Sequence, residues 1–404
     1  MQHIVLQESQ PAELLTLPYD VAVTLADLDV ATFKPQPGGL WRIEAVRKVG
    51  VVRVADTQVE IQPKVPVGRL FFMMGYALRR GFWLDHDIQV DEDRSLLPAV
   101  AHAFLTQSAR AISRGLLRGY RTIDESAPVV RGRPDITAQI TRRGGLPLPA
   151  EIIVDEYTAN IPENRILLSA ARTLLSMPSL DNGDRSSLRQ MLTRFDDVDA
   201  VPAGAPLPHV SFTRLNAHYL NALELASLIL RYASVEHLSG TVTATAYLFD
   251  MWQIFEDFLS TALKTSLERI GGTGELQRSG EFLDHGNRIA LRPDIVWTEN
   301  NSVRAVMDAK YKSVKYSRVP NSDVYQMLAY CTRYGLSDGH LIYASGEEEP
   351  CVHQIRTTDI RIHCHAIDLS LRPKELMAAI DALSARIKNI SCAFDSETMH
   401  IRRI

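Results

Sequence analysis

The spacing of apolar residues changes along this chain and divides it into three parts. Short strand-like runs dominate the first hundred residues, with a hairpin predicted over 49–54 and 58–61. A continuous apolar run over 70–78 indicates a buried helix there. Helical spacing dominates the middle of the chain, and helices alternate with strands after it. We therefore predict a multi-domain α/β protein, with a β-rich domain over 1–98, a mainly helical region over 99–245 and an α/β domain over 246–404.

The middle region carries a row of arginines. A helix predicted over 96–118 would place Arg110, Arg114, Arg118 and Arg121 at helical spacing near its end. Such a row indicates a solvated face that compensates the helix dipole, or a contact with phosphate or with an acidic partner surface. Further helices are predicted over 164–175, over 185–195 with Asp184 as N-cap, and over 215–232, with a connector over 201–208.

The last part follows the order helix, three strands, helix and further strand. A helix over 249–267 with Asp250 as N-cap precedes a strand over 277–283 and two strands that carry Asp294 and Asp308. A helix over 322–334, strands over 340–343 and 361–369, and a helix over 373–387 complete it. This order is typical of a restriction-endonuclease-like α/β core with a mixed sheet.

Two acidic residues and a lysine on these strands form the main candidate site. Asp308 and Lys310 lie two residues apart, so both side chains project from one face of a strand. The polar segment 299–302 is typical of a turn, which would bring Asp294 beside Asp308. Two such carboxylates suit a hard cation, usually Mg²⁺, and a neighbouring ammonium can orient water or stabilise developing charge. The set therefore predicts phosphodiester hydrolysis.

The same residue types also occur by chance on solvent-facing strands. The context favours a site, because apolar runs flank the motif and charges within a buried sheet are costly unless they are paired or bind metal. A second Arg-Pro-Asp-Ile segment over 133–136 is not followed by an acid-x-Lys strand. We therefore interpret Asp135 as structural.

Three further residues support the candidate site. Glu256 lies at the edge of the buried face of its helix and either reaches the metal as an outer ligand, caps a polar pocket or is half-exposed. Gln326 and Tyr330 share one face of the next helix and would hold Lys310 or a DNA phosphate. The predicted metal ligands are Asp294, Asp308 and Glu256. Lys312, Lys315 and Arg318 would add positive charge beside them.

Composition limits the other possibilities. The net charge of −4 over 404 residues excludes a general basic coat, so contact with nucleic acid needs a local patch or a partner. No apolar run is long enough to span a membrane, and the start of the chain does not resemble a signal peptide. Four scattered cysteines fit a reducing cytoplasm. The segment His363-Cys364-His365 fits a strand better than a zinc site, because no second ligand pair has suitable spacing.

These motifs together resemble the PD-(D/E)xK nuclease superfamily, in the variant with a Gln-x-x-x-Tyr helix. Over roughly 45–335 the chain resembles the McrC family, the nuclease subunits of McrBC modification-dependent restriction systems. The landmarks that carry this resemblance are the segments 50–54, 59–65, 114–116 with Tyr120, 130–133, 155–157, 163–167, and 250–251 with Phe255 and Glu256. The first forty residues match nothing in the family pattern.

The resemblance implies a division of labour between two proteins. McrC-like chains bind no nucleotide themselves, and this chain has no Gly-x-x-x-x-Gly-Lys-Ser/Thr loop. They dock through their N-terminal part onto a hexameric AAA+ GTPase, stimulate it and cut double-stranded DNA, while the partner recognises 5-methylcytosine. Mg²⁺ is the implied cofactor, with Mn²⁺ as a substitute. Arg53 and Lys64 are candidates for the docking contact.

Two alternatives stay open from the sequence. One is a stand-alone restriction or repair nuclease of the same superfamily, which would need its own surface for recognising DNA. The other is a regulator that stimulates an AAA+ partner without cutting DNA. The intact set of Asp294, Asp308 and Lys310 disfavours the second alternative.

Overall fold

A computed structural model divides the chain into two compact units. The first comprises Met1–Leu96, Leu238–Ala244 and Leu248–Ile404, and the second comprises Leu97–His237 and Thr245–Tyr247. The finer division into three domains stays a prediction. The structure describes residues 2–8, 13–44, 46, 48–54, 56–78, 96–177, 180–202, 205–238, 244–314, 319–346 and 351–401.

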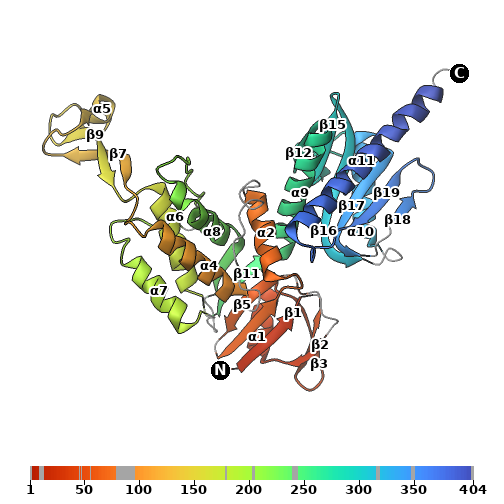
Figure 1. Cartoon of the computed structure of the whole chain (residues 1–404), viewed down its shortest axis with the longest axis horizontal. Coiled ribbons are helices and arrows are strands. Elements are labelled where there is room, and N and C mark those ends of the chain that lie inside the picture. Colours follow the sequence, from red (N-terminus) through yellow and green to blue (C-terminus); the bar gives the residue numbers. More distant parts are fainter. Residues whose placement is uncertain are drawn as a thin grey trace. The chain divides into compact units, whose positions relative to one another are not determined.

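A mixed sheet of six strands organises the C-terminal part of the first unit (Figure 1). The strand order is β12-β15-β16-β17-β19-β18, in which β17 is parallel to both of its neighbours and the other pairs are antiparallel. The α/β class and the mixed sheet are thus as predicted. The strands are β12 (Thr273–Leu276), β15 (Ile295–Glu299), β16 (Ser302–Val314), β17 (Asp338–Gly346), β18 (Cys351–Gln354) and β19 (Arg361–Ala366).

Helices cover both faces of this sheet: α9 (Met251–Ile270), α10 (Asn321–Tyr334) and α11 (Pro373–Ile401). Met327 of α10 packs with Val306 on one face. The ring of Phe255 in α9 lies 5.6 Å from that of Tyr311, whose side chain points to the opposite face because strand residues alternate. Helix α11 contacts α9 and β16, and Figure 1 shows α9 and α11 on the same side.

Helix α9 begins where the sequence predicts. The carboxylate of Asp250 accepts hydrogen bonds from the backbone N–H groups of Trp252 at 3.0 Å and Gln253 at 3.3 Å. Phe255, Leu259 and Leu263 of its apolar stripe are buried, whereas Trp252, which the helical spacing also places on that stripe, is 51% exposed. This burial fixes the rotation of the helix and hence the direction in which its polar residues point.

The hairpin β15–β16 is also confirmed. Asn300 and Asn301 have φ values of 52° and 61°. Two consecutive residues in the left-handed region form the type of tight turn that suits the twist of a hairpin, and asparagine tolerates it well. Ile295 pairs with Met307, so the preceding Asp294 comes opposite Asp308.

The strand predicted over 277–283 is wrong. Strand β12 ends at Leu276, and Gln277 turns the chain with a φ of 45°. A short pair formed by β13 (Glu281–Phe282) and β14 (Ala290–Leu291) follows. The sequence misleads here because the apolar residues 282–283 belong to this separate small hairpin.

The N-terminal part of the first unit is rich in strands. Strands β5 (Lys48–Val54) and β6 (Thr57–Gln62) form the predicted hairpin, and β1 (Gln2–Gln7) pairs with β6 in parallel. The predicted buried helix is α2 (Val67–Leu78), whose Phe72 lies 5.8 Å from the ring of Phe258 in α9. A smaller sheet and one helix precede them: β2 (Glu13–Thr16), α1 (Tyr19–Asp27), β3 (Thr32–Gln36) and β4 (Leu40–Glu44).

The second unit combines helices with a three-stranded sheet. Its helices are α4 (Leu96–Ala111), α5 (Ile136–Arg143), α6 (Pro162–Leu175), α7 (Asn182–Leu192) and α8 (Leu220–Tyr232), the last preceded by a 3₁₀ turn at Ala217–Tyr219. Its sheet consists of β7 (Gly119–Ala127), β9 (Ala150–Thr158) and β8 (Arg133–Pro134). The chain crosses between the units within β10 (Ala233–Leu238) and β11 (Ala244–Asp250).

The predicted arginine row is wrong as a helix face. Helix α4 ends at Ala111, Arg114 and Arg118 follow on a loop, and Arg121 lies on β7. Gly115 has a φ of 97°, which leaves the helical region. The backbone of Leu117 bonds to distant side chains instead, its N–H donating to Tyr219 at 2.9 Å and its carbonyl accepting from Asn164 at 2.8 Å.

Two aspartates in this unit act as helix caps. Asp135 accepts a hydrogen bond from the backbone of Ala138 at 2.9 Å and caps α5, which agrees with a structural role. Asp181, and not Asp184 as predicted, caps α7. The prediction placed the start of that helix three residues too late.

A buried carboxylate in the mixed sheet gives a test of the fold. Asp338 is 4% exposed and accepts hydrogen bonds from Arg361, at 2.8 and 2.9 Å, and from His363 at 2.7 Å. Although burial alone would raise its pKa, these partners together lower the pKa of Asp338 below its ordinary value. The contribution of this carboxylate to stability is therefore present above about pH 4 and is lost as the pH falls below it.

We expect Asp338→Asn to lower the free energy of unfolding by about 2 kcal/mol at pH 7. The difference from the wild type should narrow below about pH 4, because the carboxyl of Asp338 is then protonated in the unfolded chain while the folded protein keeps it ionised. Urea denaturation from pH 3 to 7 measures both effects. The exposed Asp359→Asn variant is the control, and an equal loss there would contradict the assignment.

Candidate active site

The hairpin places two carboxylates and an ammonium together. Asp294 and Asp308 are 8% and 2% exposed. Oδ2 of Asp294 accepts a hydrogen bond from the backbone N–H of Ala309 at 2.7 Å, which fixes it against β16. Nζ of Lys310 lies 2.5 Å from Oδ2 of Asp308. The structure thus brings together the three residues that the sequence singled out.

A chain of hydrogen bonds extends from the lysine to α10. Nζ of Lys310 donates to Gln326 at 2.9 Å, and the amide of Gln326 donates to the hydroxyl of Tyr330 at 2.8 Å. That hydroxyl donates to the backbone carbonyl of Arg292 at 3.0 Å. Gln326 and Tyr330 therefore hold Lys310 in one position and tie α10 to the segment before Asp294.

Glu256 reaches the same place from α9. It is 5% exposed, and its Oε1 accepts a hydrogen bond from Gln277 at 2.8 Å. Its Oε2 is buried and has no hydrogen-bond donor within reach among the described residues. This low exposure excludes the interpretation of Glu256 as a half-exposed residue, and leaves those of an outer metal ligand and of a cap on a polar pocket.

Burial and neighbouring charges raise the pKa values of these carboxylates. Burial, together with the charges of Asp308 and Glu256, raises the pKa of Asp294 to about 8. Burial likewise raises the pKa of Glu256 and of Asp308, although Lys310 acts against this for Asp308. For Lys310, burial alone would lower the pKa, but the surrounding carboxylates raise it and keep the ammonium charged.

These groups suit a hard cation. A divalent ion would relieve the mutual repulsion of the carboxylates and give Oε2 of Glu256 a partner. Within the described ranges, no three His, Cys, Asp or Glu side chains already form a cluster that could hold a metal. Mg²⁺ commonly uses one or two carboxylates with waters and phosphate oxygens, so the set fits that ion without such a cluster.

Lys312 forms an ion pair with a buried carboxylate, which the sequence did not predict. Its Nζ lies 2.7 Å from Oδ2 of Asp323 in α10, which also accepts a hydrogen bond from Tyr343 at 3.1 Å. Its charge is therefore partly compensated. Lys315 and Arg318 lie outside the described residues.

Gln277 is a site residue that sequence reasoning missed. Its backbone N–H donates to the carbonyl of Asp294 at 2.9 Å, and its side chain bonds to both Glu256 and Arg292. It therefore joins both acidic residues from one position. No sequence signal identifies it, because its role depends on the left-handed turn after β12.

The loop after β6 contacts the residue that follows Lys310. Nζ of Lys64 lies 4.1 Å from the centre of the Tyr311 ring, and its backbone N–H donates to Glu8 at 3.0 Å. Burial raises the pKa of Glu8 and lowers that of Lys64. Lys64 is thus engaged inside the unit, and its role in docking stays a prediction, as does that of Arg53.

The segment His363-Cys364-His365 lies on β19, as the strand interpretation predicts. The rings of His340 and His365 stack, with Nδ1 of His340 and Nε2 of His365 3.2 Å apart.

None of the described helices is both long and apolar enough to cross a membrane.

Comparisons with known proteins identify relatives of this chain. The family model of the McrBC 5-methylcytosine restriction system component matches residues 43–344. A chain from the Thermococcus gammatolerans assembly of McrB AAA+ hexamers with bound McrC is similar in fold, with a TM-score of 0.57 at 16% identity over 96% of this chain and all (100%) of that one. A chain of the Thermococcus gammatolerans McrBC complex is 19% identical over 66% of this chain and 88% of its own, with a TM-score of 0.37. No curated protein matches the chain.

The crowding of carboxylates predicts an unusual gain in stability. In EDTA, Asp294→Asn should raise the Tm by roughly 2–5 °C, because it removes a buried charge from beside two others. The folded pKa of about 8 exceeds the ordinary value of 3.8, so wild-type stability falls as the pH rises between them. The rise in Tm caused by Asp294→Asn should therefore increase from about pH 4 and level off near pH 8.

Thermal denaturation between pH 5 and 9 measures this gain. The matched control is Asp284→Asn, since Asp284 accepts hydrogen bonds from the backbone of Arg288 and Ile289, and Ile289 in particular lowers its pKa. The same substitution there should lower the Tm. A lower Tm for both variants would mean that the carboxylates do not repel one another in the folded protein.

Proposed function

The chain belongs to the family of McrBC 5-methylcytosine restriction system components, and we propose that it is the DNA-cleaving subunit of such a system. One observation supports this most. Asp294 and Asp308 are buried side by side, and the ammonium of Lys310 lies 2.5 Å from the second of them. Buried charge of this kind is costly for folding and is typical of sites that bind a metal and phosphate.

The architecture around the site supports a nuclease of the PD-(D/E)xK superfamily. We propose that the mixed sheet with α9 and α10 is a restriction-endonuclease-like core. In this interpretation Asp294 directly precedes one strand, while Asp308 and Lys310 form the Asp-x-Lys part on the next. Gln326 and Tyr330 provide the helix of the Gln-x-x-x-Tyr variant.

Asp294 and Asp308 would hold a Mg²⁺ ion, or Mn²⁺ in its place, with Glu256 as an outer ligand. When bound, such an ion polarises the scissile phosphate and lowers the pKa of a bound water. Gln277 keeps Glu256 in place through its 2.8 Å hydrogen bond. Binding requires Asp294 to lose its proton, so the cation and the proton compete at this carboxylate.

Lys310 is the residue that meets the developing charge. Gln326 holds its Nζ at 2.9 Å, while Asp308 and its neighbours keep the ammonium protonated. A fixed ammonium can orient the attacking water and stabilise negative charge on the phosphate without reorganising during the reaction. The hydroxyl of Tyr330 acts through Gln326 and not on the substrate.

A partner would supply nucleotide hydrolysis and recognition of DNA. The structure that shares this fold is McrC bound to McrB AAA+ hexamers. We propose a McrB-like AAA+ GTPase as the partner of this chain, double-stranded DNA as the substrate and 5-methylcytosine as the recognised modification. Cys331, Cys351 and Cys364 are free thiols, which fits the proposed cytoplasmic location.

Cleavage in the presence of partner, GTP, Mg²⁺ and methylated DNA tests the proposal. Asp308→Asn should reduce the cleavage rate by roughly 100-fold or more, since it removes a ligand and a charge from the site. Stimulation of the partner's GTP hydrolysis should persist, which shows that the variant folds and docks. Gel electrophoresis of the products and phosphate release measure the two activities.

The second Arg-Pro-Asp-Ile segment offers the matched control. Asp135→Asn makes the same Asp-to-Asn change in a segment identical to the one around Asp294, but it alters only a helix cap, so cleavage should continue. Wild-type cleavage by Asp308→Asn would overturn the catalytic assignment. Cleavage by the wild-type chain alone would instead overturn the dependence on a partner.

A further inference from the structure

The segment 277–292 carries the short hairpin of β13 and β14, and both of its ends are fixed at the candidate active site. At one end, the backbone N–H of Gln277 donates to the carbonyl of Asp294 at 2.9 Å. At the other end, the carbonyl of Arg292 accepts a hydrogen bond from the hydroxyl of Tyr330 at 3.0 Å. A molecule bound to this hairpin would therefore lie beside the site carboxylates.

The turn of the hairpin has a fixed shape. Oδ1 of Asp284 accepts hydrogen bonds from the backbone N–H groups of Arg288 at 2.9 Å and Ile289 at 2.8 Å. Its carboxylate is thus engaged by the turn itself. A hollow of about 530 Å³ lies between the turn and the end of α10. The turn therefore projects from the core instead of packing against it.

Two exposed arginines of this hairpin have no acidic partner within the described part of the chain. The guanidinium of Arg288 forms neither an ion pair nor a hydrogen bond there, and that of Arg292 bonds to the neutral side chain of Gln277. Arg278, by contrast, pairs with Glu281 at 3.1 Å. Guanidinium groups without a carboxylate partner suit phosphate oxygens. The charge of Arg292 lies two residues before the first site carboxylate, where the scissile phosphate is proposed to bind.

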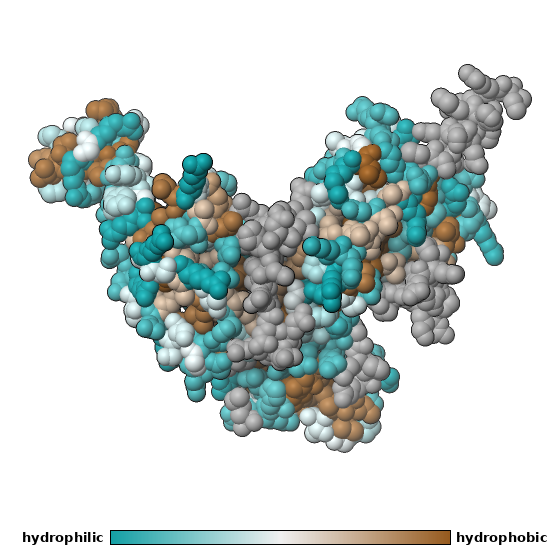
Figure 2. Space-filling view, viewed as in Figure 1, coloured by the Kyte–Doolittle hydropathy of each residue, from teal (hydrophilic) through white to brown (hydrophobic). Residues whose placement is uncertain are grey.

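Apolar side chains accompany these arginines. Leu283 and Ile289 lie opposite each other at the base of the turn, where the N–H of Leu283 donates to the carbonyl of Ile289 at 2.9 Å. The two side chains are 37% and 51% exposed. On the face shown in Figure 2, the C-terminal part of the first unit is largely hydrophilic, with apolar residues scattered among polar ones. Apolar residues gathered on one projecting turn therefore indicate a contact surface.

The major groove of duplex DNA fits the shape and the charge of this hairpin. That groove is about 12 Å wide and admits a two-stranded ribbon, whereas the minor groove of about 6 Å does not. Phosphates on either side of the groove attract arginines, and apolar side chains can contact the methyl groups of thymine within it. A single strand offers no groove for the hairpin to enter.

We propose that the hairpin binds duplex DNA in its major groove beside the scissile phosphate. Arg288 and Arg292 contact phosphates of the backbone, while Leu283 and Ile289 contact apolar atoms at the base edges. The choice of DNA as the occupant rests on the proposed function. The inference adds a surface of this chain that positions the duplex over the site carboxylates.

Fluorescence anisotropy of the full chain with a labelled duplex of about 20 base pairs, in EDTA at low salt, tests this proposal without cleavage or a partner. Arg288→Ala/Arg292→Ala should weaken binding roughly 10-fold or more and lower the slope of log affinity against log salt by about 1.8, or about 0.9 for each phosphate contact. Arg288→Lys/Arg292→Lys keeps the charge and should retain the slope. Leu283→Ser/Ile289→Ser should weaken binding roughly 3-fold or more with the slope unchanged. Circular dichroism confirms that each variant folds.

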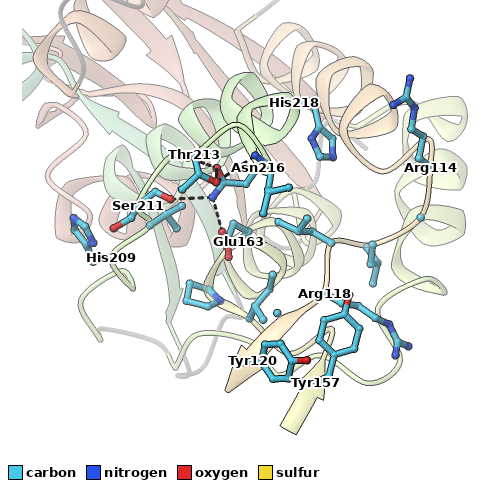
Figure 3. Close-up of a pocket in the computed structure, with 18 residues that line it drawn as sticks. Arg114, Arg118, Tyr120, Tyr157, Glu163, His209, Ser211, Thr213, Asn216 and His218 are labelled. Atoms are coloured by element: carbon cyan, nitrogen blue, oxygen red, sulfur yellow. Dashed lines mark hydrogen bonds between the residues drawn. The ribbon is translucent and has the colours of Figure 1, made fainter. Parts of the chain in front are cut away.

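Arg118→Ala/Arg356→Ala is the matched control. It also removes two exposed guanidinium groups that form no ion pair or hydrogen bond among the described residues. Arg356 follows β18 at the other end of the mixed sheet, and Arg118 lies at a cavity of about 780 Å³ in the second unit (Figure 3). The affinity of this control for the duplex should equal that of the wild type.

Three results would each overturn the proposal: wild-type affinity in the arginine-to-alanine variant of the hairpin, an equal loss in the control, or equal competition by a single strand. Equal competition by polyglutamate would also overturn it, and would favour an acidic protein as the occupant. Asp308→Asn should bind the duplex at least as tightly as the wild type, because it removes a negative charge. Failure of the nuclease assignment, which cleavage measures, is therefore distinguished from failure of this inference.

Discussion

The repulsion between buried carboxylates is the constraint on which the candidate site depends. Glu256, Asp294 and Asp308 come from three elements and are each largely removed from water. Burial, together with the charges of Asp308 and Glu256, raises the pKa of Asp294 to about 8. A fold can keep such a group only if its packing is strong enough to hold the charges together.

The surrounding structure provides that packing. Helix α9 is fixed by its buried apolar stripe and presents Glu256, while the turn at Asn300 and Asn301 sets the register that places Asp294 opposite Asp308. The backbone of Ala309 and the ammonium of Lys310 stabilise the charges from within the sheet. The remaining repulsion is what a cation would relieve, so the same arrangement that strains the free protein favours metal binding.

The candidate site and the hairpin beside it present different chemistry. The site concentrates buried acids around one lysine, whereas the hairpin carries two exposed arginines that have no acidic partner in the described part of the chain. An overall charge of −4 is compatible with contact to DNA when basic residues are gathered locally in this way.

The sequence alone determined the elements that depend on residues close together along the chain. The period of apolar residues predicted α9 and the hairpin β15–β16, and the spacing of Asp308 and Lys310 predicted their common face, because these depend on neighbours along the chain. The structural role of Asp135 could also be predicted, since no acid-x-Lys strand follows it.

Tertiary structure alone decided the rest. Gln277 joins Glu256 to Asp294 only because the chain turns after β12, and the arginine row leaves the helix only because Leu117 bonds to Tyr219 and Asn164. Such bonds join residues from 17 to 102 positions apart, and no local pattern encodes them.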